Sequence, residues 1–288
     1  MASDDTKPTR FGRSRRIAVG AAVGLLAAGV LAPVGMAVSL EQTADRNIVH
    51  KPLLPSQAGL GQSIARPQSA GEALNILLVG NQVNGPKASS IMLAHISSDR
   101  ERVDLIRLPR GVEAGGKSSL GTTYTNGGSP ALVRSLENSL QVPIDNVAET
   151  DIQGVKGVVD AVDGIEVQTS GGVSSMDGDA ALAYLSEGQN VRSAAASADR
   201  QDAVLRGIVV KLAKPSTLAN PSTLSSFTDA ATRNLTTDES FSASDIRNLA
   251  LSLRNVRSDD IGSVTASAAD LPQIGQALQQ DDTAALAD

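Results

Sequence analysis

Residues 89–111 read SSIMLAHISSDRERVDLIRLPRG, and this stretch decides the fold of the chain. Two apolar runs, at 89–97 and 102–108, flank the polar turn 98–101. This pattern predicts a β-hairpin. Just upstream, NILLVG at 75–80 is a short apolar run that predicts a buried strand. The chain therefore enters its folded part through three strands before residue 109.

Strand and helix patterns alternate after the hairpin. Residues 111–128 are rich in Gly, Ser and Thr and predict a loop, and Ser129-Pro130 is a favourable helix start. Further strands are expected at 146–152, 165–169 and 261–267, and helices at 129–140, 153–163, 177–185, 198–214, 221–234, 244–254 and 272–280. This alternation favours a layered α/β domain with helices on both faces of one sheet.

Upstream of the strands lies a stretch without charge, residues 17–40. About 20 apolar residues are enough to span a bilayer as a helix. Basic residues precede this stretch and acidic residues follow it, so the positive-inside rule puts residues 1–16 in the cytoplasm as a basic tail and the remainder outside. The alternative is a cleaved signal peptide. We expect a transmembrane signal anchor at 17–40, a flexible stalk at 41–72, an extracytoplasmic domain at 73–280 and a frayed acidic tail at 281–288.

Composition excludes several classes of function. The chain has 288 residues, a net charge of −6 and no cysteine, so disulfides and thiolate chemistry are absent. The basic residues do not gather into one patch in the folded part of the chain, and nucleic-acid binding is unsupported. His50 and His95 lie in unrelated contexts, so no metal site is expected from them. His95 alternates with apolar residues on a strand, where a half-buried histidine with satisfied hydrogen bonds is the expected state.

Two arginines are candidates for ligand contacts. Arg110 follows Pro109 at the end of a strand, where loops commonly carry binding residues. Arg200 and Gln201 begin a predicted helix. The guanidinium is a planar fork suited to phosphate. Ordinary surface salt bridges are the alternative role for both arginines.

At this point the sequence resembles the LytR–CpsA–Psr family of bacterial cell-envelope proteins. Four stretches carry the likeness: 75–80, 89–111, the region from TYTNGG at 123–128 to 142–168, and MDGDAALAYL followed by DRQDAVL at 176–205. The resemblance implies a three-layer α-β-α sandwich with a central mixed β-sheet, preceded by one transmembrane helix. It also implies an apolar tunnel for a polyprenyl-phosphate lipid. Active members are similar to Mg²⁺-dependent phosphotransferases that ligate a lipid-linked glycopolymer to peptidoglycan.

The departures from the family pattern fall on its polar site. The family's carboxylates are replaced by Gln82, Ser89 and Gly111, and Lys87 is the cation nearest to a missing arginine. Other family positions are also neutral here: Ser186, Gly188, Ala194 and Ser197. Mg²⁺ usually relies on carboxylate ligands. The resemblance therefore predicts head-group binding by Arg110, Arg200, Gln201 and Lys87, without catalytic or metal-ligating residues and with no cofactor.

The function predicted from these residues is a membrane-anchored protein of cell-wall assembly. It would bind polyprenyl-phosphate lipid with little or no transferase activity, and an active family member is a possible partner. One alternative is a divergent active phosphotransferase that draws charge from Asp99, Asp104 or Glu113. Another is a structural interaction module without a ligand. Direct transcriptional regulation is rejected, because an acidic domain outside the membrane does not contact DNA.

Overall fold

The computed structural model describes residues 46–56, 64–81, 88–115, 118–151, 153–189, 200, 203–204, 207–208, 211, 220–233, 235–252 and 260–283. The expected anchor at 17–40 lies outside the described residues. Among the helices that the structure describes, none is long and apolar enough to cross a membrane.

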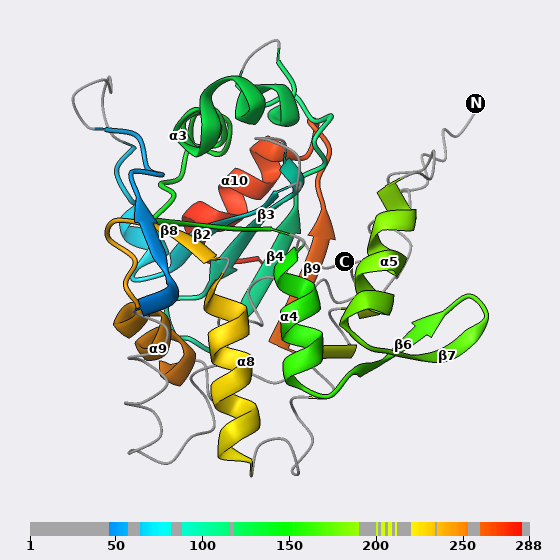
Figure 1. Ribbon diagram of the computed structural model, residues 1–288. Helices are drawn as coiled ribbons and strands as arrows, with labels where there is room; N and C mark the ends of the chain where they lie inside the picture. The colour runs from blue at the N-terminus through cyan, green and yellow to red at the C-terminus, as the bar shows by residue number, and fades with distance from the viewer. Residues whose placement is uncertain are drawn as a thin grey trace, which may run out of the picture.

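A mixed sheet forms the centre of the fold (Figure 1). Its strands run in the order β1-β8-β5-β2-β3-β4-β9. Their bounds are β1 Val49–Lys51, β2 Leu74–Asn81, β3 Ala88–Ile96, β4 Val103–Arg107, β5 Asn146–Asp151, β8 Leu235–Asp238 and β9 Ile261–Thr265. β2 lies between β5, its parallel neighbour, and β3, its antiparallel neighbour. A strand covered on both faces reads as a continuous apolar run, which explains NILLVG.

The predicted hairpin is confirmed. β3 and β4 pair antiparallel, with Met92 opposite Arg107 and Ile96 opposite Val103. The turn between them contains Arg100, whose φ of 63° is the left-handed conformation that closes the hairpin.

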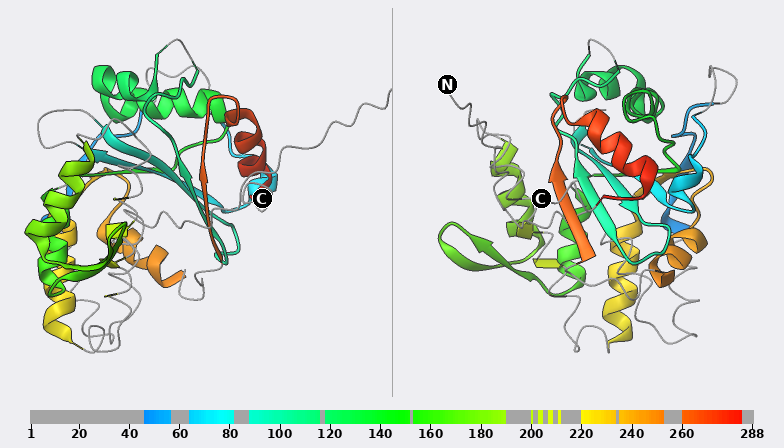
Figure 2. Two further views of the ribbon diagram at one scale, coloured as in Figure 1. Left: turned by 90° about the vertical axis from the view of Figure 1, so that its right-hand side faces the viewer. Right: turned by 180° about the vertical axis from the view of Figure 1, so that it is seen from behind.

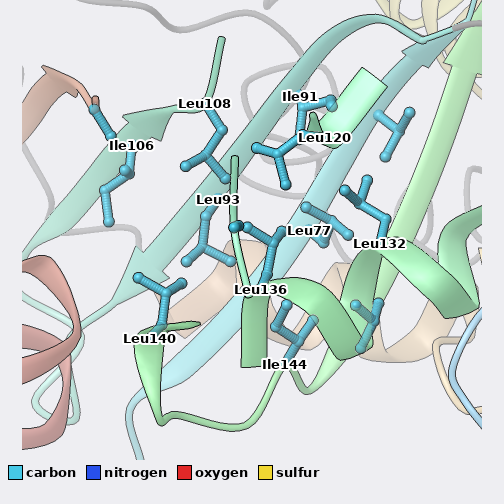
Figure 3. Packing of buried hydrophobic residues seen from close by; sticks show 14 of the residues in the cluster. Leu77, Ile91, Leu93, Ile106, Leu108, Leu120, Leu132, Leu136, Leu140 and Ile144 are labelled. Atoms are coloured by element: carbon cyan, nitrogen blue, oxygen red, sulfur yellow. The ribbon is translucent and has the colours of Figure 1, made fainter. Parts of the chain in front are cut away.

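Helices lie on both faces of the sheet (Figure 2). Their bounds are α3 Leu120–Leu140, α4 Gln153–Ala161, α5 Gly178–Gln189, α8 Pro221–Arg233, α9 Ala243–Ser252 and α10 Leu271–Gln280, with a short 3-10 helix at Gln68–Ala70. α3 and α10 cover one face. Leu132, Leu136 and Leu140 of α3 pack there against Leu77 and Leu93 of the central strands (Figure 3).

The opposite face holds a second apolar cluster. Ile76, Leu78 and Leu105 from the sheet gather there with Phe241, and Leu249 of α9 packs against them. A third cluster is made by α4, α5 and α8 together with a separate two-stranded ribbon, β6 Ile165–Thr169 and β7 Gly172–Met176. Phe227 of α8 is fully buried in it.

The predicted loop at 111–128 is wrong in its second half. Residues 120–127 are helical and belong to α3. Gly128 has φ 62° and ψ −162°, a conformation open to glycine, and it kinks the helix at that point. The expected start at Ser129-Pro130 is therefore the start of the second segment of α3. Gly and Thr before the kink have low helix propensity, but packing on the sheet overrides it.

Parts of the expected stalk and tail belong to the folded domain. β1 pairs with β8, and Leu53 is buried in the core against α3. At the other end, Thr283 is buried and its hydroxyl donates to Asp104. Both segments were missed for the same reason: their partners lie far away in the sequence.

Candidate functional site

The ends of several strands meet at one edge of the sheet. β2 ends at Asn81 and its parallel neighbour β5 ends at Asp151, while the antiparallel β3 begins there at Ala88. The loop after β4 carries Arg110 to the same edge. Ligands in open α/β sheets bind beyond the carboxyl ends of the strands. This edge is therefore the candidate site.

Arg110 is held in place by its neighbours. Its Nη1 donates to the carbonyl oxygen of Ala88 at 3.1 Å, and its own carbonyl accepts from the amide of Gly121 at 2.9 Å. A Cβ added at Gly121 would lie 3.1 Å from the Cβ of Arg110, so glycine permits the close approach of α3. The hydrogen bond to Ala88 directs the guanidinium toward the start of β3.

A chain of hydrogen bonds lies next to Arg110. Tyr124 Oη donates to Asn81 Oδ1 at 2.7 Å, and Asn81 Nδ2 donates to Glu149 Oε2 at 3.3 Å. Ser129 Oγ donates to Glu149 Oε1 at 2.5 Å. Tyr124 is 4% exposed, and its burial raises the pKa of the phenol, with the charge of Glu149 adding to the shift. Tyr124 therefore stays protonated and acts as a donor.

The kink of α3 explains this arrangement. The first segment brings Gly121 to Arg110 and Tyr124 to Asn81, and the second segment begins with Ser129 against Glu149. A straight helix would not present all of these side chains to one edge.

Arg200 is placed beside α5. Its Nη1 donates to the carbonyl oxygen of Tyr184 at 3.0 Å, and its guanidinium lies 4.7 Å from the centroid of the Tyr184 ring. Stacking on an aromatic face orients the guanidinium. Gln201, Lys87 and Gln82 lie outside the described residues.

Two of the positions at which the resemblance implies a replaced carboxylate, Ser89 and Gly111, are among the described residues. A Cβ added at Gly80 would lie 2.9 Å from the Ser89 hydroxyl, so Ser89 packs on the end of β2. A Cβ added at Gly111 would meet no heavy atom within 4 Å. Gly111 borders an open hollow of about 420 Å³ that is lined by Pro109, Gly111, Val112, Glu113, Ala266, Ser267 and Ala268.

The described residues do not fit a hard cation at this edge. Among them, no three acidic or histidine side chains gather closely enough to hold a metal ion. Asp99 lies in the turn at the opposite end of the hairpin. Asp104 is buried, and its carboxylate pairs with Arg102. Glu113 alone of the suggested carboxylates lies near Arg110, on the rim of the hollow.

The residues that sequence reasoning missed are Asn81, Tyr124, Ser129 and Glu149. The motif TYTNGG at 123–128 carries part of the family resemblance, but the sequence does not indicate which of its side chains belong to the site. One signal was available in the sequence: Glu149 is a charged residue near the end of a predicted strand. In the structure this strand, β5, lies beside β2, which ends at Asn81. Strand order was needed to connect the two.

Together, the fold and this edge define a mixed α/β domain with an arginine and a polar cluster at the ends of its central strands. The chain belongs to the LytR_cpsA_psr family, whose model matches residues 50–287.

Named relatives and solved structures agree with this assignment. The chain is 28% identical over 214 residues to the polyisoprenyl-teichoic acid–peptidoglycan teichoic acid transferase TagU of Bacillus anthracis, covering 67% of this chain and 70% of that protein. It is similar in fold to a structure of TagT bound to LIIa-WTA, with a TM-score of 0.56 and 18% identity over 79% of this chain and 98% of that one. The crystal structure of TagV of B. subtilis gives a TM-score of 0.54 at 20% identity, over 73% of this chain and 97% of that one.

Proposed function

We propose that this protein acts in cell-wall assembly by binding a polyisoprenyl-phosphate-linked polymer at the edge of the sheet, with little or no transfer of the polymer. The observation that carries the proposal is the position of Arg110, whose guanidinium donates to Ala88 at the strand ends and whose backbone carbonyl accepts from Gly121. The names of the relatives, which act on polyisoprenyl-linked teichoic acid, supply the class of ligand.

The apolar part of the ligand has a candidate location as well. The cluster on the sheet around Ile76 and Leu105 and the cluster beneath α4, α5 and α8 lie on the side of the sheet away from α3 (Figure 2). Apolar chains are stabilised when they leave water for an apolar environment. We assign the prenyl chain to this side and the phosphate to Arg110, with Arg200, Gln201 and Lys87 as further head-group contacts.

The proposal places the domain outside the cell. Residues 17–40 would anchor it, with residues 1–16 in the cytoplasm, so that the phosphate site stays close to the membrane that holds the lipid. An active family member remains a proposed partner.

Low transferase activity is proposed because of the substitutions at Ser89 and Gly111. Neither residue offers a carboxylate, and the described residues gather no metal-binding set around Arg110. Metal and arginine together neutralise the charge that accumulates on a transferred phosphate. Head-group binding needs the arginine alone, so we propose that binding is independent of Mg²⁺.

Lipid binding is tested on the full-length protein. Native lipid is extracted from purified wild-type protein and from Arg110→Ala, and both extracts are analysed by mass spectrometry. Polyprenyl phosphate that co-purifies with the wild type and falls at least tenfold in the variant would support the proposal. Recovery of equal amounts of polyprenyl phosphate from both proteins contradicts the role of Arg110. If no polyprenyl phosphate is found with either protein, the result favours a structural module without a ligand.

The second candidate function is transfer to peptidoglycan, which the similarity to the teichoic acid transferase TagU favours. It predicts Mg²⁺-dependent cleavage of a lipid-linked pyrophosphate that Arg110→Ala abolishes. Absence of turnover with every divalent cation tested, in protein that still binds the lipid, would exclude it.

A further inference from the structure

Glu149 holds a carboxylate that no described basic residue neutralises. Its two oxygens accept one hydrogen bond each, from Ser129 and Asn81. The salt bridges of the described residues do not include it. An ionised carboxylate offers about four lone-pair sites, so further donors can still bind. The side chain is only partly covered, and a ligand can reach it.

The orientation of this carboxylate is fixed in advance. Tyr124 donates to the oxygen of the Asn81 amide, which turns the amide nitrogen toward Glu149. The raised pKa of Tyr124 keeps that phenol a donor. Ser129, which is 1% exposed, holds the second oxygen. Binding groups whose rotamers are locked by neighbours lose little entropy when a ligand arrives.

Glu149 also lies close to the proposed phosphate site. Asn81 is opposite Ala88 in the pairing of β2 with β3, and the carbonyl of Ala88 accepts from Arg110. Neighbouring strands are about 5 Å apart. A phosphate on Arg110 would therefore have Asn81 one strand away on its β5 side and Glu149 two strands away, at about 10 Å, where a sugar attached to the phosphate extends.

Charge decides which part of a ligand Glu149 accepts. Two like charges in one site disfavour each other, so a second phosphate or a uronic acid is disfavoured beside this carboxylate. Hydroxyl and amide N–H groups are donors and are favoured there. We infer that Glu149 is a specificity-determining residue that recognises the neutral sugar attached to the phosphate bound by Arg110. The inference rests on the proposed function and names the part of the ligand that this site selects.

The test compares two lipids that differ in one sugar. Full-length protein in nanodiscs is titrated with polyprenyl phosphate and with polyprenyl-phosphoryl N-acetylglucosamine. Glu149→Gln keeps the size of the side chain but replaces an acceptor oxygen with a donor group. We expect it to weaken binding of the sugar-bearing lipid about tenfold and to leave the sugar-free lipid unchanged or bound more tightly.

Glu101→Gln is the matched control, because it makes the same change of charge at an exposed position in the turn at the opposite end of the hairpin. It should change either affinity less than about threefold. Thermal unfolding of each variant is measured in parallel. If Glu149→Gln does not fold, Glu149→Asp replaces it; this variant keeps the charge but withdraws it by one methylene, and we expect a smaller selective loss.

The outcomes separate the two proposals. If Glu149→Gln weakens the affinity for both lipids equally and also lowers the melting temperature, Glu149 is a structural residue and the inference is overturned. Arg110→Ala should weaken the binding of both lipids to the same extent. A selective role of Glu149 requires that Glu149→Gln weakens binding of the sugar-bearing lipid more than binding of the sugar-free lipid. If the wild type binds neither lipid, the proposed function fails and the inference fails with it.

Discussion

His95 Nε2 lies 3.0 Å from the carboxylate Oδ1 of Asp281, although 186 residues separate them in the chain. Nδ1 of the same ring lies 2.8 Å from Asn75 Oδ1, and the side chain is 1% exposed. Asp281 Oδ2 also accepts from the backbone and hydroxyl of Ser98. This network fastens the end of α10 to the central hairpin. The expectation of a satisfied histidine is confirmed, but the ring is fully buried.

Stability should fall on mild acidification because of His95. Burial lowers the pKa of the ring below its usual value, although Asp281 opposes the shift through its hydrogen bond and charge. The unfolded chain therefore binds a proton more readily, and folding stability declines as the pH falls through about 6.5 toward the folded pKa. Urea unfolding between about pH 5.5 and 7.5 measures this slope. Nearby Asp104 and Arg66 also act on the ring, so His95→Gln is the control. An unchanged slope in that variant would contradict the assignment.

Loss of the carboxylate at 281 should lower the free energy of unfolding at neutral pH. Asp281→Ala removes the acceptor for His95 and for both donors of Ser98. Leaving buried donors unsatisfied costs about 1–3 kcal/mol. Denaturant unfolding measures the change. Asp282→Ala, at an exposed neighbouring position, is the comparison and should stay within about 0.5 kcal/mol of the wild type.

Substitution of Gly128 should destabilise the site. Its φ of 62° and ψ of −162° suit glycine, so Gly128→Ala is expected to cost about 1–3 kcal/mol. The kink also positions Ser129 against Glu149, so selective binding of the sugar-bearing lipid should decline. Gly111→Ala is the control, because an added Cβ meets nothing within 4 Å there. Similar stabilities for the two variants would show that the backbone conformation at the kink does not require glycine.

Close packing of α10 on α3 depends on Gly275. A Cβ at this position would overlap the carbonyl oxygen of Leu140. The backbone of Leu140 cannot shift as easily as a flexible side chain. Gly275→Ala should therefore lower the free energy of unfolding by at least about 1–3 kcal/mol. The exposed neighbour Gln276→Ala tests the helix itself and should change little. Both are read from the midpoint of thermal unfolding.

Restoring carboxylates tests why transfer is proposed to be weak. Gly111→Asp combined with Ser89→Asp places acids at family positions, and the space at Gly111 is open. We expect Mg²⁺ binding to become measurable by calorimetry and any transfer to rise about tenfold or more. Gly111→Asn with Ser89→Asn has nearly the same shape without charge. Equal behaviour of the acidic and amide pairs would remove the charge argument.

Local pattern was sufficient for much of the fold. The hairpin at 89–108, the strand NILLVG and the placing of Arg110 after a strand all depend on residues close together in sequence. Periodicity and turn residues report such neighbours directly. The first segment of α3 was missed because Gly and Thr disfavour helix locally, and burial of Leu120 and Tyr124 against the sheet overrides that preference.

The sequence by itself determined the class of fold, the family likeness and the neutral residues at 82, 89 and 111. Only the tertiary structure decided that Glu149 faces Asn81, that Asp281 closes on His95 and that Asp104 is buried beside Arg102. These contacts depend on strand order and on the packing of α3 and α10. A residue pattern records which face of an element is apolar, but not which distant element covers it.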